Sequence, residues 1–385
     1  MQDILVIGAG KIGAVVAELL AQTPAAGGYR VTVADRSAAL LAAIDVPEFA
    51  APPAAPIAAA PRAARLRTLR LDAADPLALR AALQGRFAVL SAAPFHLTLG
   101  IAQAARDAGV HYLDLTEDVA STRAIRALAQ GAATAFIPQC GLAPGFIGIV
   151  AAELARRFDS LDSVRLRVGA LPAYPSNALN YNLTWSTEGV INEYCEPCEA
   201  IVDGQRREVP ALEEREEFSL DGVLYEAFNT SGGLGTLCET LAGTVRTLNY
   251  RTIRYPGHAA IMKALLHDLR LKDRRDVLKD ILEQALPTTL QDVVIVFVTV
   301  AGQRDGRFTQ DTYVRKVYSQ VCAGKLRSAI QITTASSLCA MLDLLGQGRL
   351  PQHGFVRQED VGLADFLGNR FGRVFADSHH IADAA

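Results

Sequence analysis

The feature that most constrains the fold is a glycine-rich turn that joins a short apolar strand to a helix at the start of the chain. Residues 4–7 read Ile-Leu-Val-Ile and run directly into Gly8-Ala9-Gly10-Lys11-Ile12-Gly13. In this spacing the first glycine permits a sharp turn, the second lets backbone amides approach a pyrophosphate, and the third lets the helix pack on the sheet. Because a helix N-terminus attracts anions, the pattern predicts a dinucleotide-binding unit that uses residues 8 and 10–13.

A carboxylate follows at the position where such units hold the ribose. The next apolar strand, residues 29–34, ends at Asp35, close to the ~20 residues that usually separate the glycines from the ribose-binding acid. Its negative charge disfavours a 2′-phosphate, whereas the neighbouring Arg36 and Ser37 are groups that hold one. We therefore expect NAD as the cofactor, with NADP as the alternative.

Strands and helices continue to alternate, which predicts a Rossmann-type doubly wound parallel sheet. Further strands are expected at 66–71, 87–92, 110–114 and 133–138, and helices at 76–83 and 97–108, with Asp75 as an N-cap. The turns that follow two of these strands add Asp72 and the run Ala92-Ala93-Pro94-Phe95 to the expected cofactor site. An Ala/Pro-rich stretch at 47–65 is expected to form an extended surface loop.

Length and charge narrow the class of protein. The 385 residues suit a dinucleotide domain at 1–140, a substrate and dimerisation α/β domain at 141–332 and a C-terminal segment at 333–385. Strands at 164–169, 244–250 and 293–300 predict a mixed sheet in the second domain, with a helical stretch at 255–286. A net charge of −3 without a basic stripe argues against nucleic-acid and membrane partners and favours a small-molecule substrate. We expect a cytoplasmic protein, because the sequence shows no signal-peptide pattern and no apolar run of the ~20 residues that a membrane-spanning helix needs.

The cysteines and most histidines have structural interpretations. Cys195 and Cys198 are expected to be reduced thiols, because the sequence offers no second ligand pair for zinc. His111 lies in a predicted strand and is expected in the core, whereas His96 either reaches the cofactor or faces solvent. His379 and His380 lie in a polar tail, where we expect no role.

Several segments together resemble the saccharopine dehydrogenase family. They are His111-Tyr112-Leu113-Asp114-Leu115-Thr116-Glu117-Asp118, Cys140-Gly141-Leu142-Ala143-Pro144-Gly145, residues 180–194, 229–233 and 252–258. Within the family they resemble the lysine 6-dehydrogenase branch most closely. The loop after Ile44 and the pair Gln139-Cys140 depart from the family pattern. The resemblance implies a homodimer and a C-terminal helix, expected from Ile332, that returns to the Rossmann domain.

The resemblance implies NAD(P)-dependent oxidation of a C–N bond in a lysine-type amino acid, with L-lysine 6-dehydrogenase favoured. A first alternative is saccharopine or a carboxynorspermidine-like secondary amine, which needs a second carboxylate anchor such as Arg246, Arg251 or Lys263. A second alternative, of another class, is a non-catalytic dinucleotide-binding sensor. No metal is expected in any of the three.

The implied chemistry assigns roles to individual residues. Arg254, with Tyr255 beside it, is expected to bind the substrate carboxylate, because a guanidinium forms bidentate pairs. Glu117 and Glu188 are expected to hold the amine and accept its proton. The carboxylate of Asp118, next to Glu117, is equally suited to cap the following helix. The remaining assignments are His258 as proton carrier, Thr230 and Ser231 at the substrate, and Thr116, Cys140 and Gly141 at the cofactor. Tyr181 and Trp185 are expected either to line the methylenes of the substrate or to fill core space.

Overall fold

The computed structural model describes residues 1–23, 27–44, 65–322 and 324–376. The predicted Ala/Pro-rich loop therefore lies outside the described residues except at its end, and so do His379 and His380. The chain divides into two compact units. The first comprises Met1–Gly141, Thr334–Arg357 and Gly368–Arg373, and the second Leu142–Thr333, Gln358–Leu367 and the described residues from Val374 onward.

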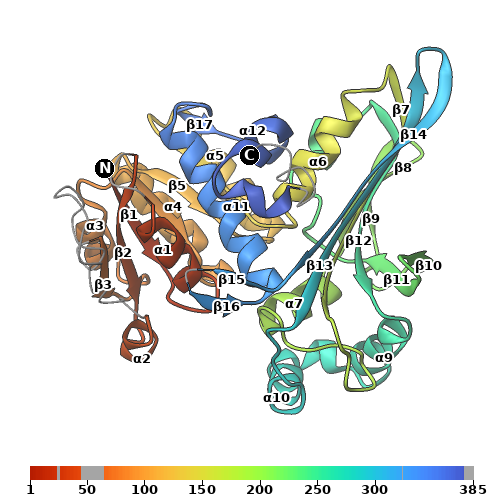
Figure 1. The fold of residues 1–385 in the computed structure, drawn as a ribbon, viewed down its shortest axis with the longest axis horizontal. Coiled ribbons are helices and arrows are strands. Elements are labelled where there is room, and N and C mark those ends of the chain that lie inside the picture. Colours follow the sequence, from red (N-terminus) through yellow and green to blue (C-terminus); the bar gives the residue numbers. More distant parts are fainter. Residues whose placement is uncertain (24–26, 45–64, 323, 377–385) are drawn as a thin grey trace, which may run out of the picture. The chain divides into compact units, whose positions relative to one another are not determined.

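The first unit contains the predicted doubly wound parallel sheet (Figure 1). Its strand order is β17-β6-β5-β4-β1-β2-β3, and neighbouring strands pair in parallel. The strands are β1 (Gln2–Ile7), β2 (Tyr29–Asp35), β3 (Leu66–Arg70), β4 (Ala88–Ser91), β5 (His111–Asp114), β6 (Ala135–Ile137) and β17 (Gly354–Phe355). The order reverses between β1 and β4, and ligands of such sheets bind beyond the carboxyl ends of the strands at this point.

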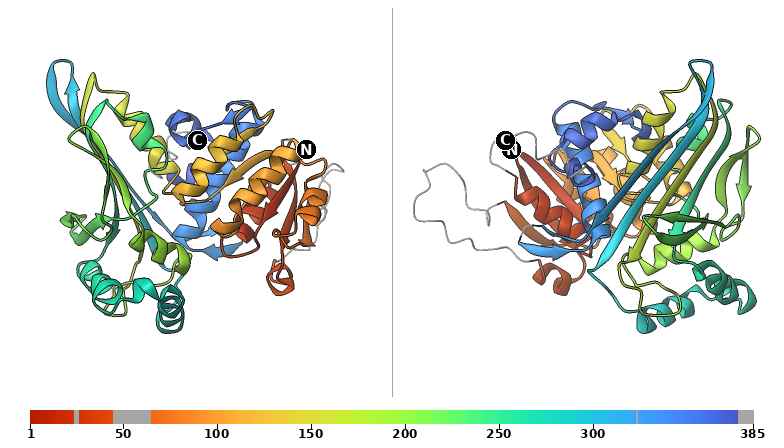
Figure 2. Two further views of the ribbon diagram at one scale, coloured as in Figure 1. Left: turned by 180° about the vertical axis from the view of Figure 1, so that it is seen from behind. Right: turned by 45° about the vertical axis from the view of Figure 1, so that its right-hand side comes forward.

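Helices cover both faces of this sheet, because both faces of its central strands are apolar. Leu5 and Ile7 pack in a core cluster with residues of α3, α4 and α5, whereas Ile4 and Val6 are fully buried on the opposite face. Figure 1 looks onto α1 and α11, and the left view of Figure 2 onto α4 and α5. The N-terminal helices are α1 (Gly13–Ala21), α2 (Ala38–Ala42), α3 (Pro76–Leu83), α4 (Phe95–Ala108) and α5 (Val119–Leu128).

The helix caps that were predicted in this unit are present. The Asp75 carboxylate accepts hydrogen bonds from the amides of Leu77 and Ala78 and so begins α3. Asp118 accepts one from Ser121 at the start of α5, which is the capping interpretation given above. His111 is half-buried, and its Nδ1 accepts a hydrogen bond from the Ala135 amide.

The C-terminal helix α11 (Ala329–Gly346) returns to the first unit, as predicted from the family resemblance. The Cys339 thiol lies 3.9 Å from the Val16 carbonyl oxygen of α1, and the Tyr29 hydroxyl donates to Asp343 at 2.7 Å. The helix is long and apolar enough to cross a membrane, but 83% of it is buried inside the structure, as expected of a core helix. Strand β17, which extends the sheet beyond β6, was not predicted.

Helix α11 begins three residues earlier than the sequence indicated. The Asp292 carboxylate accepts hydrogen bonds from the backbone amides of Ala329 and Ile330. Because these amides have no partner within the helix itself, a carboxylate supplied by another strand fixes the helix start there.

The second unit is built on a mixed sheet, as predicted, and this sheet has eight strands. Strand β12 is parallel to β7, whereas β13 is antiparallel to both β7 and β14, and these strands form the long ribbon in Figures 1 and 2. The strands are β7 (Ser160–Pro172), β8 (Cys198–Val202), β9 (Gln205–Val209), β10 (Glu216–Leu220), β11 (Val223–Asn229), β12 (Val245–Arg254), β13 (Asp292–Arg304) and β14 (Arg307–Tyr318). Strands β15 (Gln320–Cys322) and β16 (Lys325–Arg327) form a separate hairpin.

The predicted helical stretch at 255–286 is wrong as one piece, because the helix is interrupted. A π-helical turn at Ala264–Asp268 and a 3-10 turn at Leu271–Asp273 separate α9 (His258–Lys263) from α10 (Arg275–Ala285). Between these turns Arg270 adopts a left-handed conformation with φ of 56°, which an α-helix does not allow. The other helical segments are α6 (Phe146–Ala155), α7 (Thr187–Cys195), α8 (Leu237–Thr240), Gln358–Asp360, α12 (Leu363–Gly368) and Gly372–Phe375.

Candidate active site

The glycine-rich turn has a shape that only glycine permits. A Cβ atom on Gly8, whose φ is +101°, would lie 2.6 Å from the Ala92 carbonyl oxygen, and one on Gly13 would lie 1.9 Å from the Gly8 carbonyl oxygen. A Cβ on Gly10 would meet nothing within 4 Å. Gly8 and Gly13 are thus required by the fold itself, while Gly10 borders open space that suits a pyrophosphate against the backbone.

The start of α1 is arranged to receive an anion. Ile12 occupies the N-cap position without a side-chain hydrogen bond, and the first turn contains no acidic residue. The Asp35 carboxylate accepts hydrogen bonds of 2.8 Å from the amides of Ala9 and Ser37, which holds it beside the turn. Each carboxylate oxygen has further lone pairs that suit ribose hydroxyls. These observations fit a dinucleotide at this position.

The other predicted cofactor residues lie at the same carboxyl edge of the sheet. Ala92, Ala93 and Pro94 join β4 to α4, of which Phe95 is the first residue, and Thr116 and the half-buried Glu117 follow β5. Asp72 follows β3, where its side chain accepts a hydrogen bond from the Ala74 amide. Lys11, Arg36 and His96 are exposed at or near these strand ends.

Asp114, which we did not predict as a site residue, connects two of these turns. Its carboxylate accepts hydrogen bonds from the Thr116 amide at 3.0 Å, from the Gln139 amide at 2.8 Å and from the Tyr112 hydroxyl at 2.7 Å. Burial raises the pKa of this carboxyl to about 6, although these three hydrogen bonds oppose the rise. Cys140 is fully buried: its thiol lies 3.0 Å from the Ile137 carbonyl oxygen, and its amide donates to the Asp114 carbonyl oxygen at 2.8 Å.

In the second unit, Arg254 ends β12 and is 2% exposed. Its Nε donates to the Tyr194 hydroxyl at 3.0 Å, and its Nη1 donates to the Ile253 carbonyl oxygen at 2.9 Å. The guanidinium carbon lies 5.1 Å from the centre of the Tyr181 ring and 5.9 Å from that of Tyr194. Two aromatic rings and two hydrogen bonds therefore fix a buried cation.

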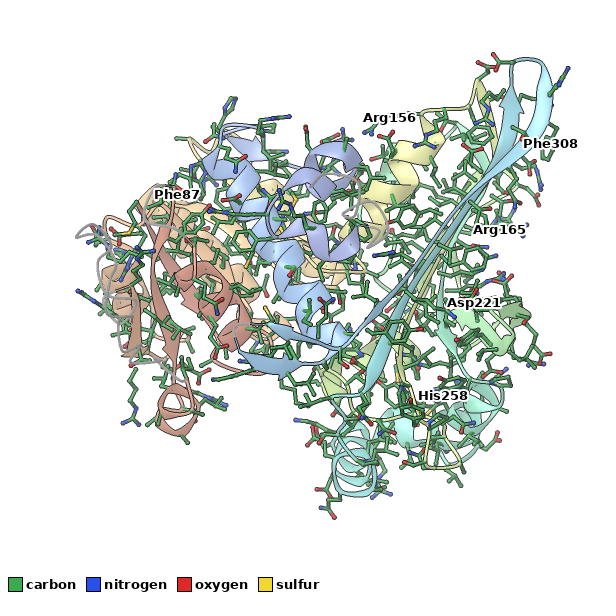
Figure 3. The ribbon with its side chains drawn as sticks, in the orientation of Figure 1. Phe87, Arg156, Arg165, Asp221, His258 and Phe308 are labelled. Atoms are coloured by element: carbon green, nitrogen blue, oxygen red, sulfur yellow. The ribbon has the colours of Figure 1, made fainter. Side chains whose placement is uncertain are left out.

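His258, labelled in Figure 3, is the first residue of α9 and belongs to the same cluster. Its Nε2 lies 3.0 Å from the Tyr194 hydroxyl, and its Nδ1 lies 2.9 Å from the Leu179 carbonyl oxygen. Burial and the nearby Arg254 lower the pKa of His258 to about 3, so the imidazole is neutral at physiological pH. This differs from the near-neutral pKa on which its expected role as proton carrier depended.

Four other predicted or neighbouring residues lie near this cluster, which consists of Arg254, Tyr181, Tyr194 and His258. Thr230 and Ser231 directly follow β11 in the sequence and are buried, and the Ser231 amide donates to the Glu193 carbonyl oxygen of α7. Trp185 is fixed against Gly189, where a Cβ atom would lie 2.5 Å from its ring. Within the described part of the chain, buried hydroxyl oxygens without a hydrogen bond include those of Tyr181, Thr184 and Thr230.

Tyr255 and Glu188 lie apart from the cluster. The Tyr255 hydroxyl donates to the Pro172 carbonyl oxygen, and its ring stacks on Tyr225 in a separate apolar cluster. Glu188 is exposed in the first turn of α7. Glu193, further along the helix, is buried instead and acts electrostatically on Arg254.

The sequence contained a signal for the residues that we missed. Thr187, Val190, Ile191 and Tyr194 recur at the spacing of one helix face, and all four are buried. This pattern places Tyr194 inside the unit and Glu188 off that face. Cys195 and Cys198 remain free thiols, and no group of three metal-ligating side chains occurs among the described residues.

The Rossmann sheet and the glycine turn define a dinucleotide-binding fold, which is joined to a second unit with a mixed sheet. Residues 4–137 match the saccharopine dehydrogenase NADP binding domain, and residues 141–371 match the saccharopine dehydrogenase C-terminal domain. The chain belongs to the saccharopine dehydrogenase family, as the sequence resemblance indicated, and is an NAD(P)-dependent oxidoreductase of that family.

Solved structures show the same fold at low sequence identity. The protein is similar to the saccharopine dehydrogenase (L-Glu forming) of Saccharomyces cerevisiae, with a TM-score of 0.72, 18% identity and coverage of 93% of this protein and 94% of that one. It is also similar to the homospermidine synthase of Legionella pneumophila, with a TM-score of 0.62, 11% identity and coverage of 97% and 89%.

Proposed function

We propose that the protein is an NAD-dependent amino-acid dehydrogenase that oxidises the C–N bond at the ε-carbon of a lysine-type amino acid, and that its substrate is L-lysine. The observation that supports the proposal most strongly is that the Arg254 guanidinium is buried among neutral partners. It is a buried cation whose hydrogen bonds go to two neutral oxygens, those of the Tyr194 hydroxyl and the Ile253 carbonyl, and the ion pairs found among the described residues do not include it. The buried Glu193 acts on it electrostatically. A buried charge of this kind is strongly stabilised by an anionic ligand.

The number of free donors on Arg254 suits one carboxylate. A guanidinium has five N–H donors, of which Tyr194 and Ile253 accept two, so that three remain on the two Nη atoms. Two N–H groups of a guanidinium pair with the two oxygens of a carboxylate in a bidentate arrangement. We assign the α-carboxylate of the amino acid to this position.

The other candidate anchors favour a substrate with one carboxylate over saccharopine. Lys263 is 2.6 Å from Glu213, Arg246 is 2.8 Å from Asp162, and Arg251 is 3.0 Å from Glu214. Each of these cations is already neutralised by an acid of the same protein. Binding a second substrate carboxylate there would require breaking an existing ion pair.

The position of Asp35 supports NAD over NADP. Two backbone amides hold its carboxylate beside the glycine turn, where its charge repels a 2′-phosphate. The Legionella homospermidine synthase structure, whose fold is similar, is described as a complex with NAD. A bound nicotinamide accepts the hydride from the carbon that carries the nitrogen.

The protein's own residues must supply binding and proton transfer. The amine reacts in its neutral form, so a carboxylate must take one proton from the ammonium; Glu117 and Glu193 are the half-buried and buried candidates. Loss of a hydride from the neutral amine gives an iminium ion, and its hydrolysis by one water yields the semialdehyde and ammonium. His258 does not serve as the base in this scheme, because its pKa is about 3.

The test measures reduction of the cofactor by the absorbance of the reduced nicotinamide, with L-lysine or saccharopine as substrate and with NAD or NADP as cofactor. We expect turnover with lysine and NAD. Arg254→Ala should lower kcat/KM for lysine about a hundredfold or more, whereas the control Arg246→Ala, at an exposed ion pair on the same strand, should not. Turnover with saccharopine alone, or full activity of Arg254→Ala with lysine, would overturn the proposal. A protein that binds NAD but oxidises neither substrate would favour the sensor alternative.

A further inference from the structure

We infer that Tyr194 and His258 are positioning residues that fix the orientation of the Arg254 guanidinium through a directional hydrogen-bond relay. The inference rests on the proposed function, because it assigns the relay to recognition of the substrate carboxylate by Arg254. It adds Tyr194, to which the sequence analysis assigned no role, and it gives His258 a role that requires a neutral ring.

The direction of each hydrogen bond follows from the last member of the relay. The Leu179 carbonyl oxygen only accepts, so at 2.9 Å it requires the proton of His258 to be on Nδ1. The unprotonated Nε2 then accepts from the Tyr194 hydroxyl at 3.0 Å. The Tyr194 oxygen in turn presents its lone pairs to the Nε–H of Arg254, also at 3.0 Å.

This direction determines which donors of Arg254 are left for a ligand. Tyr194 accepts from Nε, and the backbone carbonyl of Ile253 accepts from Nη1. The fork between Nη1 and Nη2 is therefore the part of the guanidinium that remains for a carboxylate. The Tyr181 ring, 5.1 Å from the guanidinium carbon, restricts the plane of the group from another side.

The relay is attached to rigid elements. Tyr194 lies on α7, Arg254 ends β12, and His258 begins α9. The buried carboxylate of Glu226 accepts hydrogen bonds from the amides of Gly257 at 3.1 Å and Ala259 at 2.7 Å, on either side of His258. Glu226 thereby fixes the start of α9 and the position of the imidazole.

The substitutions that test the relay separate shape from hydrogen bonding. Tyr194→Phe keeps the ring and removes the hydroxyl. His258→Gln keeps an acceptor for Tyr194, whereas His258→Leu removes it at similar size. Tyr225→Phe, a hydroxyl removal on the opposite face of the sheet, serves as the control.

Steady-state kinetics with L-lysine and with 1,5-diaminopentane, which lacks the carboxylate, give the first readout. We expect Tyr194→Phe and His258→Leu to raise KM for lysine about tenfold or more, with a much smaller change in kcat and no change in kcat/KM for the diamine. His258→Gln and Tyr225→Phe should stay within a few-fold of the native KM. The double variant Tyr194→Phe/His258→Leu should show no additional loss, because both changes break one path. Equal losses for lysine and the diamine, or additive losses, would overturn the relay.

A second readout does not depend on turnover, so failure of the relay and failure of the proposed function can be distinguished. Nitrogen NMR of the full-length protein with ¹⁵N-labelled histidine reports the tautomer of each ring. We expect His258 to be protonated on Nδ1 alone at pH 7, with its Nε2 resonance shifted in Tyr194→Phe. A His258 that is charged at pH 7, or that holds its proton on Nε2, would refute the relay even in a fully active enzyme.

Discussion

The burial of His258 predicts a loss of stability in mild acid that belongs to the second unit. The pKa of this histidine falls from an ordinary 6.5 to about 3 because burial, and then the charge of Arg254, disfavour the imidazolium. As the pH drops below 6.5, the unfolded protein binds a proton that the folded protein refuses. Stability that is fully present above the unfolded pKa is therefore lost progressively between pH 6.5 and 3.

The size of the loss follows from the two pKa values. Each unit of pKa difference corresponds to about 1.4 kcal/mol, so lowering the pH from 7 to 5 should cost about 2 kcal/mol, and lowering it to 4 should cost about 3 kcal/mol. Other groups titrate over the same range. A comparison with His258→Gln, which does not titrate, removes their contribution because both proteins share them.

The assay uses the single tryptophan of the protein, Trp185, which packs against the apolar cluster that includes Tyr181 and Tyr194. Its fluorescence during urea unfolding reports on the second unit. We expect the free energy of unfolding of the native protein to fall about 2 kcal/mol further than that of His258→Gln between pH 7 and 5. Parallel pH dependence of the two proteins would show that His258 is not buried as a neutral ring, and would refute the reasoning.

Three further predictions concern the first unit. Because burial raises the pKa of Asp114 from 3.8 to about 6, its charge destabilises the fold as the pH rises through this range. Between pH 4 and 7.5 the free energy of unfolding of the native protein, monitored by far-ultraviolet circular dichroism, should therefore fall by about 2 kcal/mol relative to that of Asp114→Asn. A constant difference between the two proteins would contradict this. Gly10→Ala should leave the free energy of unfolding within about 0.5 kcal/mol of the native value, because its Cβ meets no protein atom, but it should weaken NAD binding measured by calorimetry. Gly13→Ala should lower both the free energy of unfolding and the affinity for NAD. An unchanged NAD affinity in Gly10→Ala would place the pyrophosphate elsewhere. Asp35→Ala should shift the kcat/KM ratio from NAD toward NADP by about tenfold or more, since it removes a charge that repels the 2′-phosphate, and an unchanged ratio would argue against contact with the ribose.

The first unit could be predicted from sequence because its determinants are local. The turn at Gly8 and Gly13 joins one strand to the next helix, and the Asp75 cap bonds to amides two and three residues away. Such features are complete within a short window of the sequence. Strand β17 was missed because it has two residues, too few to show a pattern.

The candidate substrate site depends instead on distant partners. The hydrogen bond from Arg254 to Tyr194 joins residues 60 positions apart, and that from Tyr194 to His258 joins residues 64 apart. Family resemblance indicated Arg254 and His258 as residues of interest, but the tautomer and pKa of the histidine follow only from what surrounds it. The choice between Glu188 and Glu193 likewise depended on which face of α7 is buried.

The path of the backbone decides which fragments can be produced. Strand β17 and helix α11 of the first unit lie after residue 328 in the sequence, so a protein fragment that ends at Gly141 would lack both. In that fragment strand β6 would present an open edge, and the buried hydroxyl of Tyr29 would lose its acceptor Asp343. Cofactor-binding studies on an isolated N-terminal half would therefore describe an incomplete sheet. A shorter binding module needs residues 334–357 and 368–373 joined back to the N-terminal segment by designed linkers.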